Sequence, residues 1–339
     1  MNVLSVQSLC VDFPVKGGTV HALDDIRFDV AEGETLSVVG ESGCGKSTLA
    51  KAVMRLIDPT DGRIYLNGSD ITRLGPREMA PHRSSYQMIF QDPYNSLNAR
   101  QKVGKIIARP MQVAGWSRKE IAYRMDELLE AVGLRKEALT RYPHEFSGGQ
   151  RQRIGIARAL ALRPRLLVCD EPVSALDVSI RAQVINLLQD LQEQSGVSYL
   201  FISHDLSVIR HFSDRFLVMY LGRIVEIGPA EAIWTRPAHP YTQALLGSAP
   251  VADPRLARRK KPVPPGDLPS PLNIPPGCAF ATRCPVAQDK CRAERPNLRA
   301  GPDGRRFACH FDLAPDAFAQ VAARTELQNQ EEPKRHAAQ

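Results

Sequence analysis

Four short apolar runs punctuate the chain, and each ends at a glycine or a polar residue. They span residues 36–39, 88–90, 166–169 and 199–202. Apolar runs of this length predict buried strands. Segments of good helix formers lie between them, beginning with residues 46–55. Strands that alternate with helices predict an α/β fold built on a parallel sheet.

Composition divides the chain into three parts. Residues 100–162 have a mostly helical pattern, and residues 216–227 predict a hairpin. From about residue 250, closely spaced prolines favour an extended connection over a helix. We therefore expect a folded domain over residues 1–250 with a helical subdomain at about 95–162, an irregular extension over 251–312, and a tail over 313–339 that is a frayed helix or disordered.

A glycine-rich segment, residues 40–47, joins the first predicted strand to a predicted helix. Such a loop wraps around phosphates, with its N–H groups and the helix N-terminus facing the negative charge. Lys46 would reach the β- and γ-phosphates, and the Ser47 hydroxyl would reach Mg²⁺. A chance glycine-rich turn is the alternative, and the flanking strand and helix argue against it. The predicted nucleotide-binding residues are Gly40, Ser42, Gly43, Cys44, Gly45, Lys46, Ser47 and Thr48.

Polar side chains follow the other three apolar runs. Asp170 and Glu171 follow one run, His204 another and Gln91 the third. Because the carboxyl ends of parallel strands share one sheet edge, we expect these groups near the phosphate loop. Asp170 would hold the Mg²⁺ shell, and Glu171 would polarise a water for in-line attack on the γ-phosphate. Taken singly, each residue has an ordinary alternative as an acidic turn, a cap or a surface group.

The amide of Gln91 is suited to a sensor, because it can touch Mg²⁺ or its water and still move away. Its place in the motif order makes it part of the same site as Glu171 and His204. The predicted catalytic residues are Glu171, His204 and Gln91, and the predicted Mg²⁺ ligands are Ser47, Gln91 and Asp170.

A second candidate anion site lies at residues 147–150, which open a helix predicted over residues 151–162. Ser147 is a good N-cap, and two glycines allow close backbone approach. Lys46 already holds the one γ-phosphate of this chain's own nucleotide. We therefore expect this helix start to bind the ATP of a partner subunit. Its residues are Ser147, Gly148, Gly149 and Gln150.

With these motifs in this order, the chain resembles the ATP-binding-cassette (ABC) ATPases. Residues 40–47 resemble the Walker A motif, residues 166–170 Walker B, and residues 147–150 the signature. The resemblance implies a P-loop NTPase with a RecA-like parallel sheet core, an antiparallel N-terminal β part and a helical subdomain. It also implies a head-to-tail dimer that encloses two ATP molecules.

The same resemblance implies roles for single residues. Glu171 is similar to the catalytic glutamate, Gln91 to the Q-loop residue and His204 to the switch histidine. Residues 174–177 match the D-loop, which places Asp177 at the shared nucleotide site. Phe13 lies where the family stacks an aromatic ring on adenine, and a core position is the alternative for it.

Further segments resemble the ATPases of peptide importers, and most closely the second ATPase subunit of dipeptide permeases, with the oligopeptide subunit as a near neighbour. These segments are residues 91–98, 203–208, 239–246 and 266–278. The resemblance implies a subunit that hydrolyses ATP to power peptide import. Its implied partners are a second ATPase, which makes a heterodimer, two membrane-spanning permeases and an extracytoplasmic peptide-binding protein. Dipeptides are the first expected cargo and longer peptides the second. Nickel complexes and glutathione are further alternatives.

The resemblance to importer ATPases also implies a peripheral protein on the cytoplasmic face of the inner membrane. No apolar stretch among the 339 residues approaches the ~20 needed to span a bilayer, and no signal peptide is evident. The net charge is +7, and the basic residues are spread along the chain apart from one run at residues 255–261. That run is either a solvated linker or a contact for lipid headgroups or a partner protein. We therefore expect no nucleic-acid partner. Related ATPases that act on DNA or ribosomes, the remote alternative, carry long coiled coils or two cassettes, which this chain lacks.

Four of the seven cysteines fall within about thirty residues of the predicted extension. Disulfides are not expected in a cytosolic protein, so a metal staple is favoured. The C-x5-C-x6-C-x17-C spacing lacks the tight pairs of structural zinc sites, and an all-thiolate set suits an iron–sulfur cluster. Similar cysteines in peptide-importer ATPases imply a [4Fe–4S] cluster, with zinc or no metal as the alternatives. The predicted ligands are Cys278, Cys284, Cys291 and Cys309.

Overall fold

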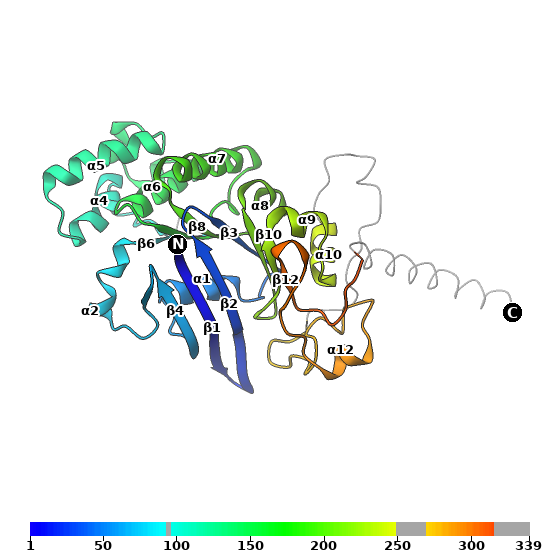
Figure 1. Ribbon diagram of the computed structural model, residues 1–339. Helices are drawn as coiled ribbons and strands as arrows, with labels where there is room; N and C mark the ends of the chain where they lie inside the picture. Colours follow the sequence, from blue (N-terminus) through cyan, green and yellow to red (C-terminus); the bar gives the residue numbers. More distant parts are fainter. Residues whose placement is uncertain (93–95, 249–268, 315–339) are drawn as a thin grey trace. The chain divides into compact units, whose positions relative to one another are not determined.

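The computed structural model describes residues 1–92, 96–248 and 269–314 (Figure 1). The basic run at residues 255–261 and nearly all of the predicted tail lie outside the described residues. The chain folds into two compact units. The first contains residues 1–11, 25–38 and 46–213, and the second contains residues 12–24, 39–45 and the chain from residue 214 onward.

A parallel sheet forms the centre of the first unit. In the order of pairing, its strands are β3 (Thr35–Val39), β8 (Ser198–Ile202), β7 (Leu166–Asp170) and β6 (Tyr86–Ile89). Every residue of β3, β7 and β8 is buried, because helices cover both faces of such a sheet. The four predicted strands and the α/β class are therefore confirmed.

Antiparallel strands precede and interrupt this parallel sheet in the sequence. β1 (Asn2–Val15) pairs with β4 (Asp61–Leu66), and β4 pairs with β5 (Ser69–Asp70). β2 (Gly18–Ala31), like β1, contributes residues to both units. The N-terminal antiparallel part implied by the family resemblance is thus present.

The helices of the first unit follow the predicted order. They are α1 (Lys46–Val53), α2 (Pro76–Met79), α4 (Val103–Val113), α5 (Arg118–Ala131), α6 (Gly148–Leu160), α7 (Val178–Ser195) and α8 (Leu206–Phe212), with 3₁₀ turns η1 (His82–Ser84), η2 (Lys136–Thr140) and η3 (Pro143–Glu145). α4, α5 and α6 gather in one helical group (Figure 1), where Ile107, Leu128 and Ile154 share a buried apolar cluster. α7 ends where Gly196 takes the left-handed conformation that favours glycine.

The second unit contains a hairpin and the described part of the C-terminal extension, besides residues 12–24 and 39–45. β9 (Arg215–Tyr220) and β10 (Arg223–Pro229) pair across Leu221 and Gly222, which both have positive φ, as a two-residue hairpin turn requires. This confirms the predicted hairpin. The extension adds β12 (Arg306–Phe307) to β10, and β11 (Arg299–Ala300) to β12, a pairing that the irregular sequence did not predict. The other elements of the second unit are α9 (Ala230–Thr235), α10 (Pro240–Gly247), α12 (Asp289–Ala293) and η4 (Pro302–Gly304).

Within the described ranges, every helix is too short or too polar to cross a lipid bilayer.

Candidate functional site

The glycine-rich loop takes a conformation that only glycine allows at several positions. Gly40, Gly43 and Gly45 have φ values of +155°, +80° and +105°. A Cβ at Gly40 would lie 2.3 Å from the carbonyl oxygen of Met219, and one at Gly45 would lie 2.5 Å from that of Ala22. The loop is therefore closely packed on its inner side. Of its other predicted binding residues, Ser42 is exposed, Cys44 is buried and Thr48 is half-buried at the start of α1.

Asp170 and Ser47 form a pair of oxygen ligands of the kind that Mg²⁺ prefers. The Ser47 hydroxyl donates to Asp170 Oδ1 at 3.0 Å. Burial raises the pKa of Asp170; the Ser47 hydrogen bond lowers it, and the neighbouring charge of Glu171 raises it. The balance is a pKa above the usual value, although Lys51 and Lys46 also act to lower it. A buried carboxylate in this setting favours a cation beside it, so these residues fit Mg²⁺.

The three predicted catalytic side chains lie together. Gln91 Nε2 donates to Glu171 Oε2 at 2.9 Å, and His204 Nδ1 lies 3.2 Å from the same oxygen. Glu171 has a φ of +48°, a left-handed conformation that is costly for a residue with a side chain. The side chain of Glu171 is largely buried, and that of His204 is exposed. A carboxylate held at one oxygen leaves its other oxygen available for a water.

The predicted signature residues form the capped start of α6. The Ser147 hydroxyl accepts from Gln150 N, and Gln150 Oε1 accepts from Ser147 N at 3.1 Å. This is a capping box, which satisfies two N–H groups of the helix start. A Cβ at Gly149 would lie 2.4 Å from Ile180 Cγ2, so glycine is required there by packing on α7. The hydrogen bonds of the Ser147 and Gln150 side chains are made to each other, not to the groups at the ends of β6, β7 and β8.

Two residues expected at the nucleotide lie at accessible positions. Asp177 is exposed at the residue before α7, directly after the buried Leu176. Phe13 on β1 is 36% exposed, so it is among the large apolar side chains that the fold does not bury. An exposed ring is more consistent with a stacking surface than with the core position that was its alternative.

The four cysteines of the extension line one apolar cavity, together with residues that include Phe280 and His310. None of the four, all within the described residues, forms a disulfide. Burial, with a smaller contribution from neighbouring cysteines, raises the pKa of Cys278 to about 11 and that of Cys284 to about 12. Across residues 1–92, 96–248 and 269–314, however, no group of three or more His, Cys, Asp or Glu side chains is arranged to hold a metal ion.

Sequence reasoning missed the contacts that hold the glycine-rich loop from outside. Glu41 N donates to the Tyr241 hydroxyl at 2.8 Å, and Arg283 Nη1 lies 2.9 Å from Glu41 Oε2. Gly222 N also donates to Cys44 O at 2.9 Å. These partners lie about 180 to 240 residues away in the sequence, so no local pattern signals them.

Comparison with known proteins gives a consistent result. A family model described as "ABC transporter" matches residues 23–174, and one described as "Oligopeptide/dipeptide transporter, C-terminal region" matches residues 225–291. The "Probable peptide ABC transporter ATP-binding protein" of Sinorhizobium fredii is 52% identical over 94% of this chain and 92% of its own length. The oligopeptide transport ATP-binding protein OppF of Salmonella typhimurium is 50% identical over 87% of this chain and 92% of its own.

Solved structures agree on the fold. A subunit of the ABC transporter complex cbiONQ from Clostridium perfringens is 28% identical and superposes with a TM-score of 0.63, over 69% of this chain and 91% of that one. A dimeric ATP-binding cassette in a post-hydrolysis state, with bound ADP and phosphate, is 27% identical with a TM-score of 0.62, over 67% of this chain and 98% of that one. The predicted ABC ATPase fold is thus confirmed.

The loop geometry generates a first prediction. Gly40→Ala should weaken the binding of a fluorescent ATP analogue by at least about tenfold, a loss of about 1.4 kcal/mol. The reason is that its Cβ would clash with the Met219 carbonyl oxygen and displace the loop. Gly196→Ala is the matched control, because Gly196 also has positive φ (+66°) but no heavy atom lies within 4 Å of its Cβ position. A folded Gly40→Ala protein that binds the analogue as wild type does would contradict the packing argument.

Proposed function

Because the chain belongs to the family of ABC transporter ATP-binding proteins, we propose that it hydrolyses ATP to power the import of peptides, with dipeptides as the leading cargo. The ATPase part of this proposal is carried by one observation: Gln91 and His204 converge on a single oxygen of Glu171, one residue after Asp170. The peptide part is supported by the match of residues 225–291 to the C-terminal region of oligopeptide and dipeptide transporters, and by the names of the relatives.

In the proposed reaction, Glu171 accepts a proton from the water that attacks the γ-phosphorus, and ADP leaves. Gln91 and His204 hold the Glu171 carboxylate in position through the contacts at Oε2. Lys46 and the glycine-rich loop bind the phosphates, and Ser47 and Asp170 would hold Mg²⁺, with Gln91 within its coordination shell. Mg²⁺, when bound, neutralises part of the charge on the phosphates.

The proposed working unit is a head-to-tail pair of ATPases. Each nucleotide would lie between the Walker residues of one subunit and the signature start of the other, residues 147–150, with Asp177 nearby. The capped and exposed start of α6 supports this, since an exposed helix N-terminus is suited to bind an anion from another chain. Phe13 would stack on the adenine.

The remaining assembly is inferred from the family. We propose that the second ATPase is a distinct chain, and that two membrane-spanning permeases and an extracytoplasmic peptide-binding protein complete the importer. The ATPase would act at the cytoplasmic face of the inner membrane. In the proposed domain organisation, residues 1–250 form the ATPase domain and residues 251–312 form the extension. The helical subdomain at about residues 95–162 would transmit the closure of the ATPase dimer to the permeases.

For the extension, we propose that Cys278, Cys284, Cys291 and Cys309 hold a [4Fe–4S] cluster. All four line one apolar cavity, and burial together with the charge of neighbouring cysteines raises the pKa of Cys278, Cys284 and Cys309, which supports a common site. A [4Fe–4S] cluster is held by four cysteine thiolates, and this cavity supplies that number of cysteines. Bound iron would draw the thiols into the thiolate form. A structural clip is the favoured role.

The proposed chemistry predicts a separation of binding from hydrolysis. Glu171→Gln should lower ATP hydrolysis by at least about a hundredfold while ATP binding persists, because an amide cannot take the proton of the attacking water. It should also accumulate an ATP-bound closed dimer, seen by size-exclusion chromatography. Glu193→Gln, an exposed glutamate of α7, is the matched control and should keep full activity. Fast turnover by Glu171→Gln would refute Glu171 as the base.

The proposed cargo is tested by uptake. Cells that lack this chain would be given wild type or Glu171→Gln, and uptake of a labelled dipeptide and a labelled pentapeptide would be measured. Dipeptide uptake restored by wild type alone is the expected result. Restoration of only the pentapeptide would favour oligopeptides as cargo. If neither uptake depends on the chain, the peptide assignment fails, and nickel complexes and glutathione become the next solutes to test.

The proposed cluster predicts iron and acid-labile sulfide, about four of each per chain, after anaerobic purification. Cys291→Ser should lose both along with the brown colour, because Cys291 is buried in the shared cavity. Cys10→Ser is the control, since Cys10 lies on β1, outside the extension. An iron-free, colourless protein, or one that contains only zinc, would rule the cluster out.

A further inference from the structure

Glu41, the second residue of the glycine-rich loop, is held by two residues from much later in the chain. Its N–H donates to the Tyr241 hydroxyl at 2.8 Å. Its carboxylate receives Arg283 Nη1, which lies 3.1 Å from Oε1 and 2.9 Å from Oε2. The backbone and the side chain of Glu41 are therefore both fixed. Glu41, Tyr241 and Arg283 all belong to the second unit.

The residues that hold Glu41 are themselves held firmly. The side chain of Arg283 is only 9% exposed, and Tyr241 is 1% exposed. Tyr220, Tyr241 and Phe280 pack as three mutually contacting rings, with centroids 4.7 to 5.5 Å apart. A buried guanidinium that loses its carboxylate would be left as an uncompensated charge, so the Arg283–Glu41 pair strongly favours this one geometry.

The position of Glu41 makes this geometry relevant to ATP. Cys44 N donates to Glu41 O at 3.3 Å, so the backbone of Glu41 shapes the turn of the loop. A loop of this type binds phosphates through correctly directed N–H groups. The Glu41 carboxylate is also a negative charge within that loop, and it would repel a triphosphate unless a cation neutralised it. Arg283 supplies that cation.

Arg283 also belongs to the segment that carries the cysteines. It directly precedes Cys284, and the segment 278–284 is folded as successive turns, with Ala281 N donating to Cys278 O and Arg283 N to Phe280 O. Phe280, which packs on Tyr241, lines the same cavity as the four cysteines. One short segment thus contacts both the cysteine cavity and the glycine-rich loop.

We infer that Arg283 and Tyr241 are positioning residues for ATP binding, through which the 278–284 segment of the C-terminal extension sets the conformation and charge of the glycine-rich loop. Nucleotide affinity then depends on the state of the extension, although no residue of the extension needs to touch the nucleotide. The inference rests on the proposed nucleotide site and is independent of the cargo.

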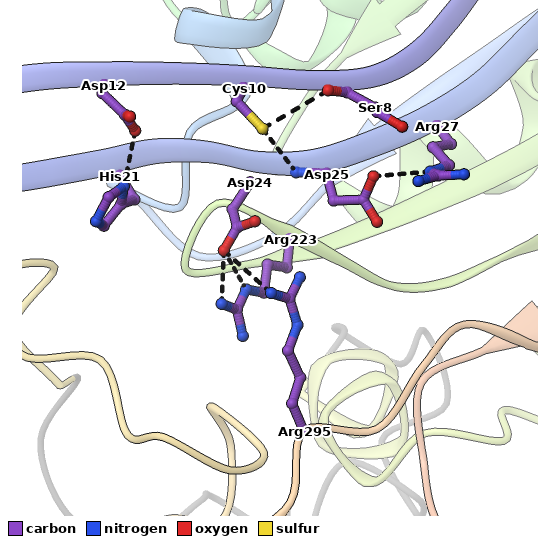
Figure 2. A network of polar contacts seen from close by, with 9 residues as sticks. All are labelled: Ser8, Cys10, Asp12, His21, Asp24, Asp25, Arg27, Arg223 and Arg295. Atoms are coloured by element: carbon purple, nitrogen blue, oxygen red, sulfur yellow. Dashed lines mark hydrogen bonds and ion pairs between the residues drawn. The ribbon is translucent and has the colours of Figure 1, made fainter. Parts of the chain in front are cut away.

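A second ionic contact of the extension provides an internal control. Figure 2 shows Arg223 of β10 and Arg295 of the extension converging on Asp24, with Nη1 of Arg295 3.3 Å from Asp24 Oδ2. Burial acts to raise the pKa of Asp24, but the hydrogen bonds and charges of the two arginines lower it overall. This contact anchors the extension without involving Glu41. A variant that loses the Arg295–Asp24 contact therefore shows the effect of a weakened attachment of the extension while the Arg283–Glu41 contact is kept.

The test compares the full-length variants Arg283→Gln and Arg295→Gln by titration with a fluorescent ATP analogue and Mg²⁺, with thermal unfolding as a check on folding. Arg283→Gln should weaken binding by about tenfold, within the range for residues that act through a neighbour. Arg295→Gln should change binding by less than about twofold. Arg283→Lys, which keeps the charge, should recover part of the affinity. Equal affinity of wild type, Arg283→Gln and Arg295→Gln would overturn the inference.

A double-variant comparison tests whether Arg283 acts through Glu41. Glu41→Gln removes the charge that Arg283 neutralises, so Arg283→Gln should cost much less affinity in that background than in wild type. An undiminished cost would contradict the inference. If Arg283→Gln does not fold, Tyr241→Phe removes only the hydroxyl that receives Glu41 N and should weaken binding severalfold, with the exposed Tyr123→Phe as control. Wild type that fails to bind the analogue would refute the proposed nucleotide site instead.

Discussion

The register of the parallel strands is the constraint on which the hydrolytic site depends. Ile89 of β6 pairs with Cys169 of β7, and Asp170 of β7 pairs with Ile202 of β8. The strands therefore end at one level, and the residues just beyond their ends meet. This brings Gln91 and His204 to Glu171 although the three lie far apart in the sequence. A slip of one residue in any pair would shift one strand end by about 3.3 Å relative to its neighbour and separate these side chains.

The hydrolytic site places charged carboxylates at positions that the fold largely buries from water. Asp170 is 5% exposed and its pKa is raised, chiefly by burial and further by the charge of Glu171. Glu171 is kept in a left-handed backbone conformation by its surroundings. Both features cost stability in the protein alone, and the buried Asp170 carboxylate favours a cation beside it. The arrangement of the site thus favours ligand binding and lowers the stability of the ligand-free protein.

The glycine-rich loop depends on a different set of contacts. Its inner side is closed by the carbonyl oxygens of Met219 and Ala22, and its second residue is held by Tyr241 and Arg283. Phosphate binding by backbone N–H groups requires the loop to be fixed before the ligand arrives, because ordering it on binding would lower the affinity. The C-terminal extension contributes part of that order. It is therefore connected to the ATPase function rather than only attached to it.

The sequence by itself determined the α/β class, the order of strands and helices, the glycine-rich loop and the polar residues that end the strands, because these are local patterns of burial, helix formation and backbone freedom. Only the tertiary structure decided which of these residues meet: the shared contacts at Glu171, the pairing of β12 with β10, the common cavity of the cysteines, and the hold of Arg283 on Glu41. These contacts join residues separated by tens to hundreds of positions. Their partners are selected by the packing of the whole chain, which no short segment encodes.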